Sequence, residues 1–178
     1  MGKYHESMSE AMQILADHEK TIFLGQAVAV PGTVMRTTLE NINPEKLIEL
    51  PVDEDFQMGM TNGMALAGYI PISIFPRWNF MLLAVNQLVN HLDKLDELSR
   101  LKPAPKVIIR TGVGSENPLN PGVQHTGDFT EAFRLMCKKI NVVRLDSAEM
   151  IVPEYRKALT RDDGISTLLI EWGDKYAE

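Results

Sequence analysis

The sequence predicts an α/β fold, built as one three-layer α/β/α domain around a mostly parallel sheet. Short apolar segments alternate with longer segments of helical periodicity along the whole chain. The chain has 178 residues, of which 44% are hydrophobic and 24% charged, an ordinary size and composition for one globular domain. No internal repeat or low-complexity segment divides it, so we expect residues 1–178 to form a single domain.

Six short apolar segments are the candidate strands. They are residues 21–24, 47–50, 69–75, 106–110, 141–144 and 167–171. The later ones are rich in β-branched residues, as strands buried on both faces of a parallel sheet are. Right-handed crossovers would connect them.

Five segments have helical periodicity: residues 7–19, 59–67, 79–95, 128–136 and 147–159. Asp128 followed by Glu131 is the pattern of a capping box at the start of the fourth. The third is apolar on more than one side, yet it carries Asn86, Gln87 and Asn90. These amides either face another subunit or lie at the solvent edge of a core helix, and their spacing leaves both open.

Composition argues against several functional classes. The net charge of -6 and the absence of any Lys/Arg run longer than two residues predict no nucleic-acid partner. The N-terminal segment lacks the apolar stretch of a signal peptide, and no apolar segment approaches the ~20 residues of a membrane helix. We therefore expect a cytoplasmic protein without a membrane partner. Cys137 is the one cysteine, is expected to be a buried core thiol, and shares no metal-ligand spacing with the histidines, so no metal site is predicted in this chain.

One acidic residue, Glu54, follows the second predicted strand and precedes a helix of small residues. Open parallel sheets bind their ligands at this edge. Taken alone, the cluster Asp53, Glu54 and Asp55 is more typical of a solvated loop.

The surrounding motifs reverse that preference. In order, they are Val52-Asp-Glu54, Gly59, Asn62-Gly63, Ala67-Gly68, Pro71, Asn79-Phe80 and Asn86-Gln-Leu-Val-Asn90, with Phe23-Leu-Gly25 before them and Gln124-His-Thr126 after them. This series resembles the transketolase-like pyrimidine-binding domain of thiamine diphosphate enzymes, as found in the beta subunits of pyruvate and branched-chain 2-oxoacid dehydrogenases. The resemblance covers nearly the whole chain and implies the thiamine diphosphate-binding fold.

The resemblance also implies roles for particular residues. Glu54 matches the glutamate that shares a proton with the pyrimidine ring, so that the exocyclic amine can deprotonate the thiazolium carbon. Phe80 matches the aromatic residue that stacks on this ring, and Val52 and Gln26 are expected beside the cofactor. His125 matches a histidine that faces the substrate. We expect Glu54 and His125 to be catalytic.

Two parts of such enzymes have no counterpart in this sequence: the Gly-Asp-Gly and Asn motif of the diphosphate-binding domain, and the C-terminal transketolase domain. We therefore expect a split enzyme for a 2-oxo acid or a ketose, whose second subunit holds the diphosphate through Mg²⁺. Thiamine diphosphate would lie between unlike subunits in a dimer of heterodimers, with residues 79–95 lining the contact. Departures from the family pattern at Gln26, Ala27, Phe56 and Asn86 leave the substrate class open.

Two alternative functions are not those of a thiamine diphosphate enzyme. A non-catalytic binding or regulatory module could keep the fold and its interface, because fold alone does not imply function. A flavodoxin-like nucleotide-binding protein would need a phosphate loop after the first strand, and residues 25–32 are a poor one. Gly112-Val-Gly114 is likewise a weak phosphate-loop signal, without the lysine and third glycine of the known motifs.

Overall fold

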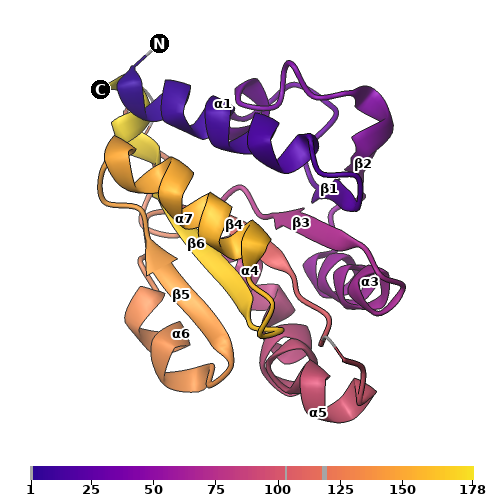
Figure 1. The fold of residues 1–178 in the computed structure, drawn as a ribbon. Helices are drawn as coiled ribbons and strands as arrows, with labels where there is room; N and C mark the ends of the chain where they lie inside the picture. Colours follow the sequence, from indigo (N-terminus) through magenta and orange to yellow (C-terminus); the bar gives the residue numbers. More distant parts are fainter. Residues whose placement is uncertain (1, 103, 118–119) are drawn as a thin grey trace.

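The computed structural model describes residues 2–102, 104–117 and 120–178. Its centre is one sheet of six parallel strands in the order β2-β1-β3-β4-β6-β5, which confirms the predicted parallel α/β fold (Figure 1). The strands are β1 (Thr21–Gly25), β2 (Leu47–Glu49), β3 (Ile70–Ile74), β4 (Ile108–Val113), β5 (Ile140–Arg144) and β6 (Ser166–Trp172). All of them point the same way, so the loops after their last residues share one edge of the sheet.

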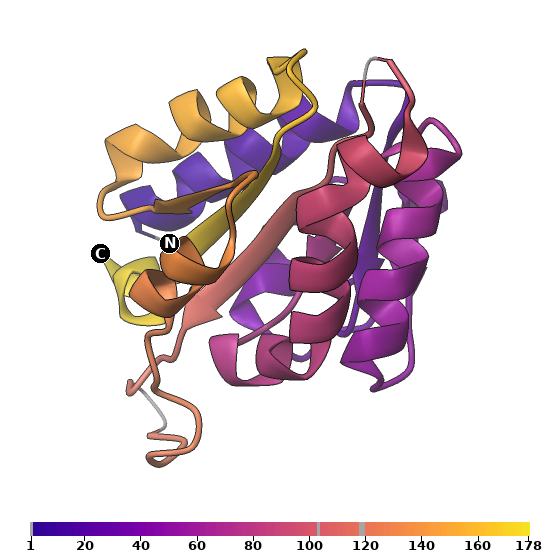
Figure 2. The same cartoon turned by 90° about the horizontal axis from the view of Figure 1, so that it is seen from below.

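Helices cover both faces of the sheet and complete the three layers (Figure 2). On one face α1 (Lys3–Ala16) packs against α7 (Ala148–Thr160), and their apolar residues form the first core cluster together with the short helix α2 (Val34–Thr37). On the other face lie α3 (Glu54–Leu66), a helical segment beginning at α4 (Trp78–Met81), and α6 (Thr130–Met136). The chain termini lie side by side, because the turn η5 (Gly173–Ala177) packs on α1 (Figure 1). No helix among the described residues is long and apolar enough to cross a membrane.

The helix predicted over residues 79–95 is not a uniform α-helix. It consists of α4, η2 (Leu82–Ala84), a π-helical turn η3 (Gln87–His91), η4 (Leu92–Lys94) and α5 (Leu95–Ser99). At the π-helical turn η3, the side-chain amide of Asn62 on α3 donates a hydrogen bond to the backbone carbonyl of Gln87, with 3.1 Å from nitrogen to oxygen. This cross-helix bond accompanies the departure from regular α-helical pairing.

The three amides of this segment lie at its solvent edge in the single chain. Asn86 and Asn90 are exposed and hydrogen-bond each other at 2.9 Å, while the half-buried Gln87 donates to Asp55. The sequence left open whether these amides face another subunit or lie at the solvent edge of a core helix. In the isolated chain they lie at the solvent edge.

Three helix starts differ from the prediction by two residues or more. The first helix, expected at residue 7, begins at Lys3. The helix expected at residue 59 begins at Glu54, because the Asp53 carboxylate caps it by accepting the backbone N–H of Phe56 at 3.0 Å. The capping box predicted at Asp128 is wrong. The Asp128 carboxylate accepts hydrogen bonds from the backbone N–H and the hydroxyl of Thr130. Glu131 pairs with Arg134 instead of bonding to the backbone N–H of Asp128. The buried position predicted for Cys137 is confirmed, and burial raises the pKa of its thiol to about 12.

Candidate functional site

Glu54 is a buried acid at the start of α3, immediately beyond the carboxyl end of β2. Only 3% of its surface is exposed, although its neighbours Asp53 and Asp55 face solvent. The Asp53 cap fixes the first turn of α3, in which the Glu54 side chain is buried. A carboxylate in this turn is favoured by the unpaired N–H groups of the helix start. Glu54 is therefore not part of a solvated acidic loop, although its two acidic neighbours are exposed to solvent.

Gln26 is the hydrogen-bond partner of Glu54. It follows the last residue of β1, and its side-chain Nε2 donates to Oε1 of Glu54 at 3.2 Å. Within the described residues this is the one hydrogen bond to the Glu54 side chain. A carboxylate can accept several more. Glu54 is thus held by the chain yet keeps acceptor capacity for another group.

The loop after β1 is tied to the end of β2 by Glu49. The Glu49 carboxylate accepts the backbone N–H groups of four consecutive residues, Ala27, Val28, Ala29 and Val30, at 2.6, 2.8, 2.7 and 3.2 Å. Burial raises the pKa of Glu49, but these hydrogen bonds outweigh it and leave the pKa below its ordinary value. A phosphate loop would offer such donors to a nucleotide. Because these N–H groups already donate to Glu49, they are not available to the phosphate of a nucleotide. This argues against a flavodoxin-like nucleotide-binding protein.

Phe80 and His125 come together from distant parts of the sequence. Their ring centroids are 5.4 Å apart with the planes inclined at 50°. Arg77, which precedes α4, donates from Nη1 to the backbone carbonyl of His125 at 3.0 Å and so fastens the long loop to the end of β3. The Nδ1 atom of His125 is buried without a partner in the described part of the chain. Both rings are half-buried.

A cavity of about 980 Å³ opens at the same edge of the sheet, between the loop after β1 and the ends of β3, β4 and β6. Gln26 and Phe80 line it. Glu54 and His125 are not among the residues that line it, but each contacts one that does: Glu54 accepts a hydrogen bond from Gln26, and the His125 ring lies beside that of Phe80. Val52 is 81% exposed on the loop before α3 and does not line the cavity.

An ion pair that was not predicted from the sequence lies beneath this cavity. Arg110 on β4 and Glu171 on β6 are fully buried, and the guanidinium and carboxylate groups meet through two hydrogen bonds. Arg110 also donates to the hydroxyls of Thr38 and Tyr176, each at 2.9 Å. Burial lowers the pKa of Arg110, but the neighbouring Glu171 raises it to a value above the ordinary one. Arg110 is the one charged residue of β4 and Glu171 the one charged residue of β6, and this was the signal that could have revealed the pair.

Glu171 and Tyr176 connect this buried cluster to the cavity, because both contribute to its lining. Tyr155 on α7 donates to Glu171 at 3.2 Å. Burial and the nearby Glu171 carboxylate raise the pKa of both tyrosines well above the ordinary value. Both phenols therefore stay protonated hydrogen-bond donors at neutral pH.

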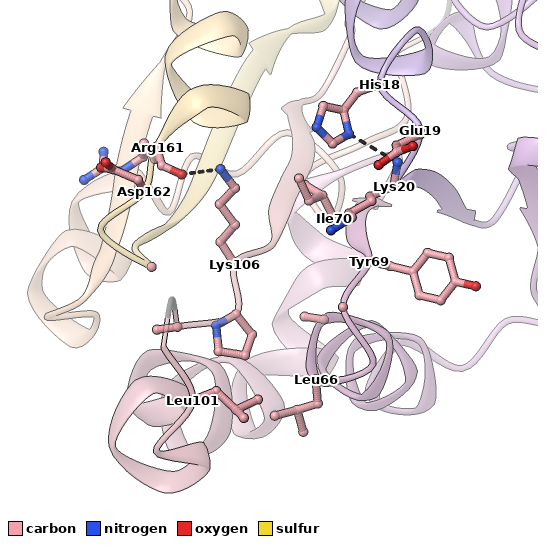
Figure 3. Close-up of a pocket in the computed structure, with 15 residues that line it drawn as sticks. His18, Glu19, Lys20, Leu66, Tyr69, Ile70, Leu101, Lys106, Arg161 and Asp162 are labelled. Carbon is pink, nitrogen blue, oxygen red and sulfur yellow. Dashed lines mark hydrogen bonds between the residues drawn. The ribbon is translucent and has the colours of Figure 1, made fainter.

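A second cavity, of about 510 Å³, lies at the opposite edge of the sheet (Figure 3). Lys106 crosses it, and its ammonium donates to the backbone carbonyls of Leu159 and Arg161 at the end of α7. Burial lowers the pKa of Lys106. None of the predicted site residues lies here, and the lysine acts as a cap for α7. Across all described residues, no group of three or more His, Cys, Asp and Glu side chains could hold a metal ion.

Comparison with known proteins gives the family. The transketolase pyrimidine-binding domain model matches residues 3–172. The 3-methyl-2-oxobutanoate dehydrogenase subunit beta of Mycobacterium tuberculosis is 26% identical over 136 residues, covering 72% of this chain and 37% of that protein. The mitochondrial pyruvate dehydrogenase E1 component subunit beta of Rattus norvegicus is 30% identical over 186 residues, covering 94% of this chain and 50% of that protein.

A solved structure with the same fold is described as a split gene transketolase, an inactive beta4 tetramer. Its TM-score is 0.67 at 17% identity, over 96% of this chain and 50% of that one. The chain thus spans half or less of the relatives named here. The family model spans nearly the whole chain and the parallel sheet agrees with it, so the chain belongs to the transketolase pyrimidine-binding domain family.

Proposed function

We propose that this chain is the pyrimidine-binding subunit of a split thiamine diphosphate enzyme that acts on a 2-oxo acid or a ketose. The observation that carries the proposal is the buried carboxyl of Glu54, with one partner from its own chain, at the ligand-binding edge of the sheet. A buried carboxyl with free acceptor capacity needs a second polar group. A pyrimidine ring nitrogen meets that need.

The residues of the site fit this cofactor. Glu54 would hold a proton at the ring nitrogen, and Gln26 would keep the carboxylate oriented through its bond to Oε1. Phe80 offers a half-exposed ring face at the cavity. When bound, thiamine diphosphate supplies the nucleophilic carbon for cleavage next to a carbonyl group. His125, beside Phe80, would donate or accept protons on the substrate.

A partner subunit is part of the proposal. It would carry the diphosphate through Mg²⁺ and pack against the helices on the α3 face, in a cytoplasmic dimer of heterodimers. Apolar side chains on this face remain uncovered in the single chain: Phe56 is 51%, Leu82 38% and Leu83 65% exposed. Uncovered apolar side chains on neighbouring helices are typical of a protein interface. The beta4 assembly of the split transketolase is described as inactive, which agrees with a need for an unlike partner.

The experiment combines this chain with a partner that carries the Gly-Asp-Gly and Asn motif, in the presence of thiamine diphosphate and Mg²⁺. We expect decarboxylation or two-carbon transfer that Glu54→Gln lowers by about 10²–10⁴-fold, because general acid–base groups contribute this much. Glu45→Gln is the matched control, since Glu45 is exposed on the turn η1 (Pro44–Lys46). Full activity in Glu54→Gln would overturn the proposal. Tight binding of the complete cofactor by this chain alone would contradict the need for a partner.

A further inference from the structure

We infer that Glu49 is a positioning residue that holds Gln26 against Glu54. The inference rests on the proposed function of Glu54 and adds a residue that does not itself reach the cofactor. Glu49 is the last residue of β2 and lies opposite Gly25, the last residue of β1, in the sheet. Its side chain therefore starts next to the point where the loop with Gln26 leaves the sheet.

Gln26 is fixed from both sides. Before it, Gly25 is paired with β2 and β3, and its carbonyl accepts the backbone N–H of Leu50 at 2.8 Å. After it, residues 27–30 donate all four of their backbone N–H groups to Glu49. The Gln26 side chain is left in the short gap between these two anchors, from which it reaches Glu54.

The backbone after Gln26 has a conformation that needs support. Ala27 has a φ of +52°, in the left-handed region that residues with a Cβ atom seldom adopt. This turn aims successive N–H groups at one point and forms an anion-binding concavity. The chain supplies its own anion there, the Glu49 carboxylate. Without that charge, four donors would lose their acceptor and Ala27 would be free to return to negative φ.

No other polar contact replaces Glu49. Among the described residues, the loop from 27 to 32 makes no further hydrogen bond of its backbone N–H groups. Val28 buries its side chain in the first core cluster, which attaches the loop to the sheet. One apolar anchor does not set the φ of the preceding residue. The carboxylate is thus the group that determines the direction of the Gln26 side chain.

The test uses NMR on the isolated chain, so it does not depend on catalysis. In Glu49→Gln and Glu49→Ala, we expect the amides of residues 27–30 to exchange with solvent at least about tenfold faster. The nuclear Overhauser contact between the Gln26 side-chain amide and the Glu54 side chain should disappear. Glu45→Gln should match the wild type in both. Added formate should restore slow exchange in Glu49→Ala, because a free carboxylate can enter the concavity.

The complete enzyme gives the second readout. Assayed at a temperature where every variant is folded, Glu49→Gln should lower kcat by up to about 10²-fold, the size of effect expected from a small misplacement of a reacting group. A role in stability alone would lower the melting temperature and leave kcat unchanged. Wild-type amide exchange and an intact Gln26–Glu54 contact in Glu49→Gln would overturn the inference. Full activity in Glu54→Gln would instead overturn the proposed function, whatever the loop does.

Discussion

Gln26 donates a hydrogen bond to Glu54 across the ends of two neighbouring strands, with 3.2 Å between Nε2 and Oε1. The acid is buried, and the described chain gives it no second hydrogen bond. Such a group is expensive to bury and is not what packing alone would select. Sites that bind or react commonly sacrifice stability in this way.

The first prediction follows from this cost. Glu54→Gln should leave the free energy of unfolding of the isolated chain unchanged or raise it by up to about 1 kcal/mol, because a neutral amide is easier to bury than a carboxylate. Urea unfolding at pH 7 measures the difference. A loss of more than about 2 kcal/mol would show that Glu54 is a structural group. In that case, a loss of activity in Glu54→Gln would be explained by misfolding and not by the missing carboxyl group.

Phe80 allows a test of the stacking surface. Phe80→Leu keeps the apolar character but removes the flat ring, so binding of thiamine diphosphate to the complete enzyme should weaken by about 1 kcal/mol, or roughly five- to tenfold. Titration calorimetry measures the dissociation constant. Tyr69→Leu is the control, because Tyr69 is half-exposed at the opposite edge of the sheet. Equal weakening in both variants would argue against a specific role for Phe80.

The sequence predicted the sheet well because its strands are short apolar runs separated by helical periodicity. All six predicted strands correspond to observed strands, with ends shifted by a few residues, as at β4. Local turns were harder to predict. The start of α3 depends on the Asp53 cap, and the wide turn at Gln87 coincides with a contact from Asn62, 25 residues earlier. Neither contact leaves a periodic signal in the sequence.

The candidate site was predictable only in part. The family motifs predict roles for Glu54 and Phe80, and the structure puts each beside a second predicted residue, Gln26 or His125, while the roles themselves stay predictions. The four amides on Glu49 were not predictable, because they depend on a left-handed Ala27 and on strand register. The buried pair of Arg110 and Glu171 likewise arises only when β4 and β6 become neighbours.

That buried pair gives the third prediction. Glu171→Gln leaves the Arg110 charge buried without its counter-ion, so we expect a loss of about 3–5 kcal/mol in the free energy of unfolding. For a chain of this length, the melting temperature should fall by roughly 10 °C. Glu131→Gln is the control, since Glu131 pairs with Arg134 on the surface and should change stability by less than about 0.5 kcal/mol. Similar small effects in both variants would contradict the buried-pair argument.

Alanine substitutions at two glycines should change the free energy of unfolding in opposite directions. A Cβ atom at Gly25 would lie 2.2 Å from the carbonyl oxygen of Ile74, so Gly25→Ala should destabilise the fold by at least about 2 kcal/mol and move the start of the Gln26 loop. A Cβ atom at Gly63 on α3 would meet nothing within 4 Å. Gly63→Ala should therefore stabilise the isolated chain by about 0.5–1 kcal/mol. Thermal unfolding of the two variants measures both changes, and a tolerated alanine at position 25 would contradict the close approach.

Acidification should release the loop after β1 only at low pH. The pKa of Glu49 is below its ordinary value in the folded chain, so its hydrogen bonds add stability that is complete above the pKa of an unfolded glutamate. This stability is lost as the pH falls through the lower, folded pKa. The amide proton shifts of residues 27–30 should therefore titrate together, with one midpoint below the ordinary pKa of a glutamate side chain. The same titration should be absent in Glu49→Gln. A midpoint at or above the ordinary value would show that the four N–H groups do not stabilise the charged carboxylate.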